Sequence, residues 1–147
     1  MFDLQLVDIN GDGALDILAT NHMGDGTGSV FGYELDGKWT RHDLSKGFPV
    51  LQSGIGQAAP GGATSFVPYV GYVGKSPIVL SGDGSQMAYL LKPNNATDVN
   101  DWSFTTTVLH NCESTVGYIS VGDTNGDGIA EIFVPCYDKG YLVVYNY

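Results

Sequence analysis

Basic residues are scarce in this chain, which has six Lys and Arg against 16 Asp and Glu and a formal net charge of −10. Binding to nucleic-acid phosphates needs clustered Lys and Arg, so this balance argues against DNA or RNA as a partner. Runs of about 18 apolar residues are missing, which argues against a membrane-spanning helix. Met1 leads directly into a strand-like segment without a basic start and an apolar stretch, so we expect no signal peptide within these 147 residues.

Cysteine is also rare, and the only two are Cys112 and Cys136. The hairpin between them turns near Gly126, which places Cys136 opposite about residue 116. A disulfide therefore requires the chain to bend back at Asn111–Ser114, because the two Cα atoms must come within about 7 Å. We favour the disulfide, and a buried free Cys136 is the alternative.

Glycine and aromatic residues are abundant instead, with 21 Gly, nine Tyr, six Phe and two Trp. The hydrophobic share is 43% and the charged share 15%, which is typical of a packed chain and not of a disordered one. Glycine and aromatics without long helical patterns favour many short strands and tight turns. The composition therefore predicts an all-β fold.

The chain repeats itself. The segment DINGDGALDILAT at 8–20 recurs as DTNGDGIAEIFVP at 123–135, and the spacing from Gly28 to Gly84 equals that from Gly84 to Gly140. Each of these three glycines is followed five residues later by a tyrosine. We predict one domain over 1–147, with repeats at approximately 1–50, 51–111 and 112–147.

Each repeat reads as up to four strands joined by tight turns such as Asp36-Gly37 and Gly82-Asp83-Gly84. The second strands are apolar at successive positions, for example Ile78-Val79-Leu80, and this indicates sheets that are covered on both faces. Such four-stranded antiparallel sheets describe the blades of a β-propeller, here an incomplete one. The expected strands are Leu4–Val7, Asp16–Thr20, Ser29–Leu35, Trp39–Leu44, Ala63–Tyr72, Pro77–Leu80, Ser85–Leu91, Ser103–Leu109, Thr115–Val121, Glu131–Cys136 and Tyr141–Tyr147.

Two acidic loops have the composition of calcium sites. Oxygen-bearing side chains occupy their first, third, fifth and ninth positions, and the seventh would offer its backbone carbonyl. Each loop has three carboxylates, an all-oxygen set that suits Ca²⁺ and not Zn²⁺. An EF-hand is excluded, because the twelfth position has no acid and strands follow; a metal-free Asx-rich turn is the alternative. The proposed ligands are Asp8, Asn10, Asp12, Ala14 and Asp16 in the first loop, and Asp123, Asn125, Asp127, Ile129 and Glu131 in the second.

The pattern Asp-x-Asn-Gly-Asp-Gly-x-x-Asp/Glu-Ile between two strands resembles the FG-GAP/VCBS repeat, which builds the integrin α-subunit-like β-propeller. Residues 39–44 also resemble the last strand of VCBS-type blades, and the likeness covers about two and a half blades. The middle repeat departs from it, with Gly71–Ser76 where the calcium loop would lie. The resemblance implies two Ca²⁺ ions that rigidify one face, and a protein or glycan ligand on the opposite face. That face would carry residues 22–25, Asp83, Asp138 and the stretch Lys46–Gly62.

We therefore expect a non-catalytic extracellular module for recognition, adhesion or scaffolding. Asn95-Ala96-Thr97 fits the N-glycosylation pattern and, with the acidity and the cysteine pair, favours a secreted or cell-surface protein. One alternative is part of a carbohydrate-active lyase or dehydratase, although His22, His42 and His110 lie in no recognisable catalytic motif. Another is an assembly protein whose open blade edges pair between copies.

Overall fold

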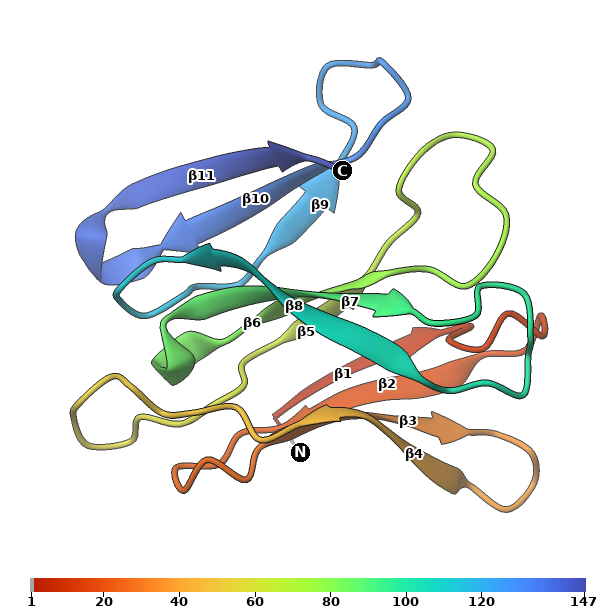
Figure 1. Ribbon diagram of the computed structural model, residues 1–147, viewed down its shortest axis with the longest axis horizontal. Coiled ribbons are helices and arrows are strands. Elements are labelled where there is room, and N and C mark those ends of the chain that lie inside the picture. Colours follow the sequence, from red (N-terminus) through yellow and green to blue (C-terminus); the bar gives the residue numbers. More distant parts are fainter. Residues whose placement is uncertain (1) are drawn as a thin grey trace.

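Short apolar runs separated by Gly- and Asp-rich turns divide the chain into eleven strands, and the computed structural model describes residues 2–147. They form three antiparallel sheets that lie one beside the next (Figure 1). The first sheet has β1 (Asp3–Val7), β2 (Asp16–Asn21), β3 (Ser29–Glu34) and β4 (Thr40–Lys46), the second has β5 (Ala63–Ser65), β6 (Ile78–Ser81), β7 (Met87–Pro93) and β8 (Phe104–Asn111), and the third has β9 (Ser120–Gly122), β10 (Glu131–Cys136) and β11 (Tyr141–Asn146). The predicted all-β fold is confirmed.

Short 3₁₀ turns form two of the connections between strands, one of them at the predicted tight turn Gly82-Asp83-Gly84. The turn η1 (Asp83–Ser85) joins β6 to β7, and η2 (Tyr137–Lys139) joins β10 to β11. The positive φ that a tight turn needs falls on Asp83 and Gln86 in the first case and on Gly140 in the second. No helix in the described part of the chain is long and apolar enough to cross a membrane.

The sheets pack in the order in which they occur along the chain. β1 contacts β5, and β4 contacts β8, so first strands lie against first strands and fourth against fourth. One core lies between the first and second sheets, and another between the second and third. The second sheet is therefore covered on both faces, which explains why Ile78, Val79 and Leu80 are all fully buried.

Two predicted strands are much shorter in the structure. The strand expected over Ala63–Tyr72 ends at Ser65, because the segment after it leaves the sheet and pairs elsewhere: Tyr69 forms a bridge with Ile129. The strand expected over Thr115–Val121 is reduced to β9 and an isolated bridge between Val116 and Cys136. Both differences arise because tertiary partners, and not the local apolar pattern, take the backbone hydrogen bonds.

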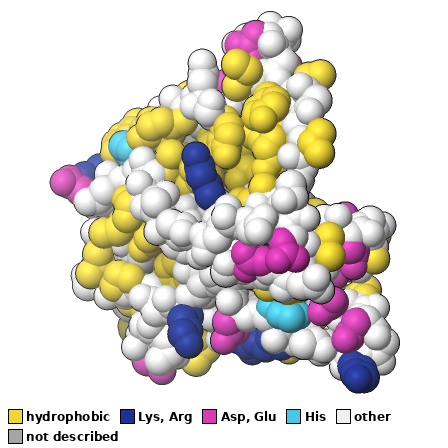
Figure 2. Space-filling view, turned by 45° about the vertical axis from the view of Figure 1, so that its right-hand side comes forward, with side chains coloured by type: hydrophobic (Ala, Val, Ile, Leu, Met, Phe, Trp, Pro, Cys, Tyr) yellow, Lys and Arg dark blue, Asp and Glu magenta, His cyan; other side chains and the backbone are white. Residues whose placement is uncertain are grey.

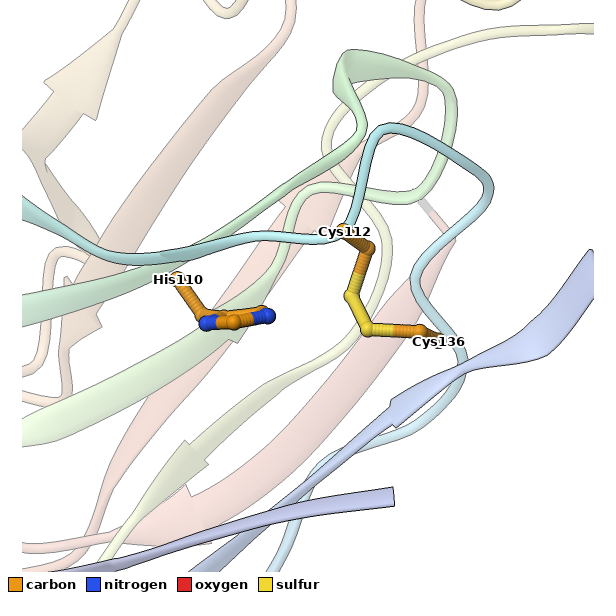
Figure 3. A group of neighbouring side chains, drawn as sticks. All are labelled: His110, Cys112 and Cys136. Atoms are coloured by element: carbon orange, nitrogen blue, oxygen red, sulfur yellow. A yellow bond between two sulfur atoms is a disulfide. The ribbon is translucent and has the colours of Figure 1, made fainter. Parts of the chain in front are cut away.

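A disulfide joins Cys112 to Cys136, with the two Cα atoms 5.3 Å apart (Figure 3). The bridge between Val116 and Cys136 confirms the register expected from the turn near Gly126. The chain bends back between Cys112 and Val116, where Glu113 has a positive φ of 51°. The alternative of a free Cys136 is wrong, and the bond ties the end of β8 to the end of β10.

Candidate functional site

The two acidic loops join the first and second strands of the first and third sheets, and both lie at the same end of the stack (Figure 1). Their first carboxylates hold the loop backbone in the same way. Asp8 accepts hydrogen bonds from the N–H groups of Gly11 at 2.7 Å and Gly13 at 2.9 Å. Asp123 accepts the same pair of bonds from the glycines at 126 and 128, at 2.7 and 2.9 Å.

The remaining oxygen-bearing side chains repeat this correspondence. The third residue, Asn10 or Asn125, accepts from the N–H of the fifth at 3.1 and 2.8 Å. The fifth accepts from the N–H of the seventh at 2.7 and 2.8 Å. The residue at the ninth position accepts a hydrogen bond from the N–H of the residue at the second. Asp16 accepts from Ile9 at 3.0 Å, and Glu131 accepts from Thr124 at 2.7 Å. The two loops therefore fold alike, as their sequences predict.

The second loop gathers its three carboxylates into one cluster. Single oxygens of Asp123, Asp127 and Glu131 lie within 4.8 Å of one another. Glu131 is only 4% exposed, and its Oε1 atom is buried without a hydrogen-bond partner. A buried carboxylate oxygen without a partner is costly, and a divalent cation would satisfy it. The donor set of this loop thus fits Ca²⁺.

In the first loop the corresponding acids, Asp8, Asp12 and Asp16, do not form such a close cluster within the described residues. The ninth residue here is Asp, one methylene shorter than Glu, and it is 1% exposed. Burial raises the pKa of Asp16; the hydrogen bond from Ile9 opposes this rise, and the nearby Asp12 carboxylate adds to it. The first loop thus has the same types of oxygen ligand, with Asp in place of Glu at the ninth position, but its carboxylates are less closely gathered.

The middle repeat has no acidic loop. Its segment 66–76 lies between the acidic loops of the first and third repeats. The Val70 N–H donates to the carbonyl of Gly128 at 2.8 Å, and the Ala130 N–H donates to that of Pro68 at 2.9 Å. On the other side, Lys75 is 1% exposed, packs beside Gly11 and donates from Nζ to the carbonyl of Asp101. Sequence reasoning missed this arrangement, although a proline within an expected strand was a signal against it.

A pocket lies at the opposite end, beside η1 and η2. Its volume is about 320 Å³, and three aromatic side chains at it are exposed: Phe2 by 55%, Tyr118 by 62% and Tyr137 by 73%. Asp83 also lines the pocket, and His22 Nε2 contacts its carboxylate at 2.8 Å. The lining residues are Phe2, Gly61, Gly62, Ser81, Asp83, Thr115, Val116, Gly117, Tyr118 and Tyr137. The lining is thus mostly apolar, with three exposed aromatic residues and Asp83.

The three histidines lie in separate places. His22 stacks on Phe2 near the pocket, with ring centroids 4.3 Å apart. His42 contacts Glu34 at 3.0 Å and stacks on Trp102. His110 points toward the disulfide (Figure 3) and contacts the hydroxyl of Tyr145 at 2.7 Å. The sulfur atoms beside it are joined to each other, so they offer no thiolate to a metal.

Asn95, the predicted glycosylation residue, is exposed on the loop between β7 and β8. Its Oδ1 atom accepts hydrogen bonds from the N–H groups of Thr97 and Asp98, both at 3.2 Å. The acceptor pattern therefore lies in an exposed Asx turn.

Comparison of the chain with protein-family models, with curated proteins and with solved structures gives no match. The fold and the loops define an all-β protein of three stacked antiparallel sheets with two acidic loops at one end. The FG-GAP/VCBS resemblance stays a prediction from the sequence.

Proposed function

We propose that the chain is a calcium-stabilised, non-catalytic recognition module of the β-propeller type. The observation that carries this proposal is the acidic cluster of the second loop, with its buried and unpartnered Glu131 Oε1. The first loop supports it, because its hydrogen bonds repeat those of the second position by position. Two Ca²⁺ ions per chain follow.

Calcium also suits the charge of the molecule. Three carboxylates in one short loop repel one another unless a cation lies between them. The whole chain carries a net charge of −10, so it attracts divalent cations over a wide area. A loop of aspartate, asparagine and glutamate oxygens offers the ligands that Ca²⁺ prefers, without the sulfur or imidazole that Zn²⁺ prefers.

The packing of the sheets supports a blade-like architecture. Propeller blades are small antiparallel sheets arranged radially and packed against their neighbours. Here β1 lies against β5 and β4 against β8, which is the contact pattern of adjacent blades. We propose that the three sheets are consecutive blades and that the acidic loops rigidify one end of them.

The ligand surface in this proposal is the opposite end, where the pocket lies. Exposed Phe2, Tyr118 and Tyr137 offer flat ring faces, and Asp83 offers a hydrogen-bond acceptor. Ring faces beside a carboxylate suit the apolar face and hydroxyl groups of a sugar, or an aromatic side chain of a protein partner. The disulfide and the exposed Asn95 favour an extracellular setting.

Metal analysis of purified protein tests the calcium proposal. After dialysis in Ca²⁺, we expect two ions per chain, and one each for Asp12→Ala and Asp127→Ala. Asp98→Ala is the matched control, because Asp98 is an exposed acid on the β7–β8 loop, outside both acidic loops, and should leave two ions. We also expect a chelator to lower the melting temperature of the wild type. No bound metal and unchanged melting in chelator would show that the loops are plain turns.

A product assay separates recognition from catalysis. A lyase acting on plant or fungal polysaccharides forms unsaturated products that absorb ultraviolet light. We expect no such absorbance, and we expect binding to immobilised ligands to weaken in Tyr118→Ala but not in Tyr141→Ala, an exposed tyrosine outside the pocket. Absorbance that grows with time would favour the enzyme.

A further inference from the structure

Each junction between sheets joins two different kinds of face. In β2, Leu18 lies in the core shared with the second sheet. In β6, Ile78 and Leu80 face back into that same core, while Val79 lies in the next one. We call the side that carries Leu18 or Val79 the forward face, and the side that carries Ile78 and Leu80 the backward face.

The second junction repeats the first. Val79 on the forward face of the second sheet packs in one core with Ile132 and Val134 of β10. These two are the positional equivalents of Ile78 and Leu80, so they define the backward face of the third sheet. A forward face thus meets a backward face both times, and the stack is directional.

Two faces of this kind are left open, one on each outer sheet. The backward face of the first sheet exposes Leu4 by 51% and Leu6 by 58%. The forward face of the third sheet exposes Leu142 by 55% and Val144 by 48%; they pair with Pro135 and Phe133 of β10. Figure 2 shows a hydrophobic patch around one basic side chain in the upper part of the molecule.

Three of the four equivalent positions are buried where a junction exists, and the fourth, Ser65 at the position of Leu6, is polar and half-buried. Ala63, the equivalent of Leu4 in the second sheet, is 3% exposed. Ala88 and Leu90, the equivalents of Leu142 and Val144, are 0% and 8% exposed. The open faces therefore expose apolar side chains at positions that a neighbouring sheet covers elsewhere. The backward face of the first sheet also carries Arg41 and Asp43 of β4, which form an exposed ion pair in the same cross-strand rows as Leu6 and Leu4.

We propose that a second copy of this chain docks head to tail, with the backward face of its first sheet on the forward face of the third sheet. The junction would continue an interface that the chain already makes twice, in the same direction. It goes beyond the proposed function and does not depend on metal binding. Because both copies are strongly acidic, moderate salt should favour the association.

Sedimentation velocity over a wide range of protein concentrations tests this inference. We expect the mass to rise above that of one chain as the concentration increases. Leu6→Lys blocks the backward face and Val144→Lys blocks the forward face, and each variant alone should stay monomeric. An equimolar mixture of the two should form a dimer that grows no further, because each variant keeps one intact face.

Ile55→Lys is the matched control, because Ile55 is exposed and lies in the loop between β4 and β5, outside both faces. It should associate like the wild type, and circular dichroism should show all three variants folded. A wild type that stays monomeric at every concentration overturns the proposal. So does association of Leu6→Lys or Val144→Lys alone, which would point to edge pairing or a two-fold contact. A normal calcium count in a monomeric chain would leave the proposed function standing.

Discussion

At the scale of single residues, the middle repeat has a buried cation of its own. Lys75 is 1% exposed and lies between the first acidic loop and the loop that carries Asp101, whose carbonyl accepts its ammonium hydrogen bond. The nearby ammonium is one reason why the pKa of Asp101 is lowered, after the hydrogen bonds from Ser103. The repeat without an acidic loop thus places a buried side chain between two neighbouring loops.

Truncating Lys75 should therefore be costly. We expect Lys75→Ala to lower the free energy of unfolding by about 3 kcal/mol, since it removes buried volume and a hydrogen bond. Lys75→Met keeps most of the volume and should cost about 1 kcal/mol. Urea unfolding measures both, and Lys38→Met, at an exposed lysine, is the control. Equal losses for Ala and Met would contradict a packing role for the Lys75 stem.

At the scale of elements, the disulfide joins β8 of the second sheet to β10 of the third across a sequence separation of 24 residues. Closing a loop of that length stabilises a fold by about 3 kcal/mol in the chain-entropy model. We expect the Cys112→Ala, Cys136→Ala double variant to lose about that much stability. Thermal unfolding with and without a reductant measures it, and reductant should leave the double variant unchanged.

The sheets should also respond differently to calcium removal. The second sheet is covered on both faces by the two cores and has no acidic loop. We expect residues 16–20 and 131–136 to lose protection against hydrogen exchange before residues 77–91 when calcium is withdrawn. Exchange measured with and without chelator compares them. Simultaneous loss in all three segments would mean that the sheets open as one unit.

Local patterns predicted most of the elements, because turn glycines and apolar runs act over a few residues. The strand Glu131–Cys136 was predicted to the residue. The course of segment 66–72 was not predicted, because its backbone hydrogen bonds are made with Gly128 and Ala130, which are far away in sequence. The matching hydrogen-bond patterns of the two acidic loops follow from their matching sequences, but the unpartnered oxygen of Glu131 depends on burial, which no local pattern encodes.

At the scale of the whole molecule, exposed carboxylates contribute part of the loss of stability in acid. Five of them have a pKa below the ordinary value, each chiefly because a hydrogen bond favours the charged form: Asp25, Asp36, Asp101, Glu113 and Asp138. A folded-state pKa below the unfolded value gives stability that is present above the unfolded pKa. That stability is lost as the pH falls through the folded one.

We therefore expect the urea midpoint of calcium-free protein to hold from pH 7 to about pH 5 and to fall below about pH 4. Asp138→Asn keeps a weaker acceptor for the Thr115 N–H and removes one charge, so its midpoint should fall less steeply in acid than that of the wild type. A wild-type midpoint that rises below pH 4 would contradict this account.

The two sides of strand β1 differ: one forms hydrogen bonds to β5, and the other exposes leucine side chains. Asp3 and Gln5 accept the N–H groups of Ala63 and Ser65 on β5, at 2.9 and 3.0 Å, while Leu4 and Leu6 face the other way. Because a strand alternates every second residue, one inserted residue would exchange the two sides and leave both β5 donors without acceptors. Two inserted residues would restore the alternation. Tolerance of insertions at this strand should therefore depend on parity, with even numbers accepted more readily than odd ones.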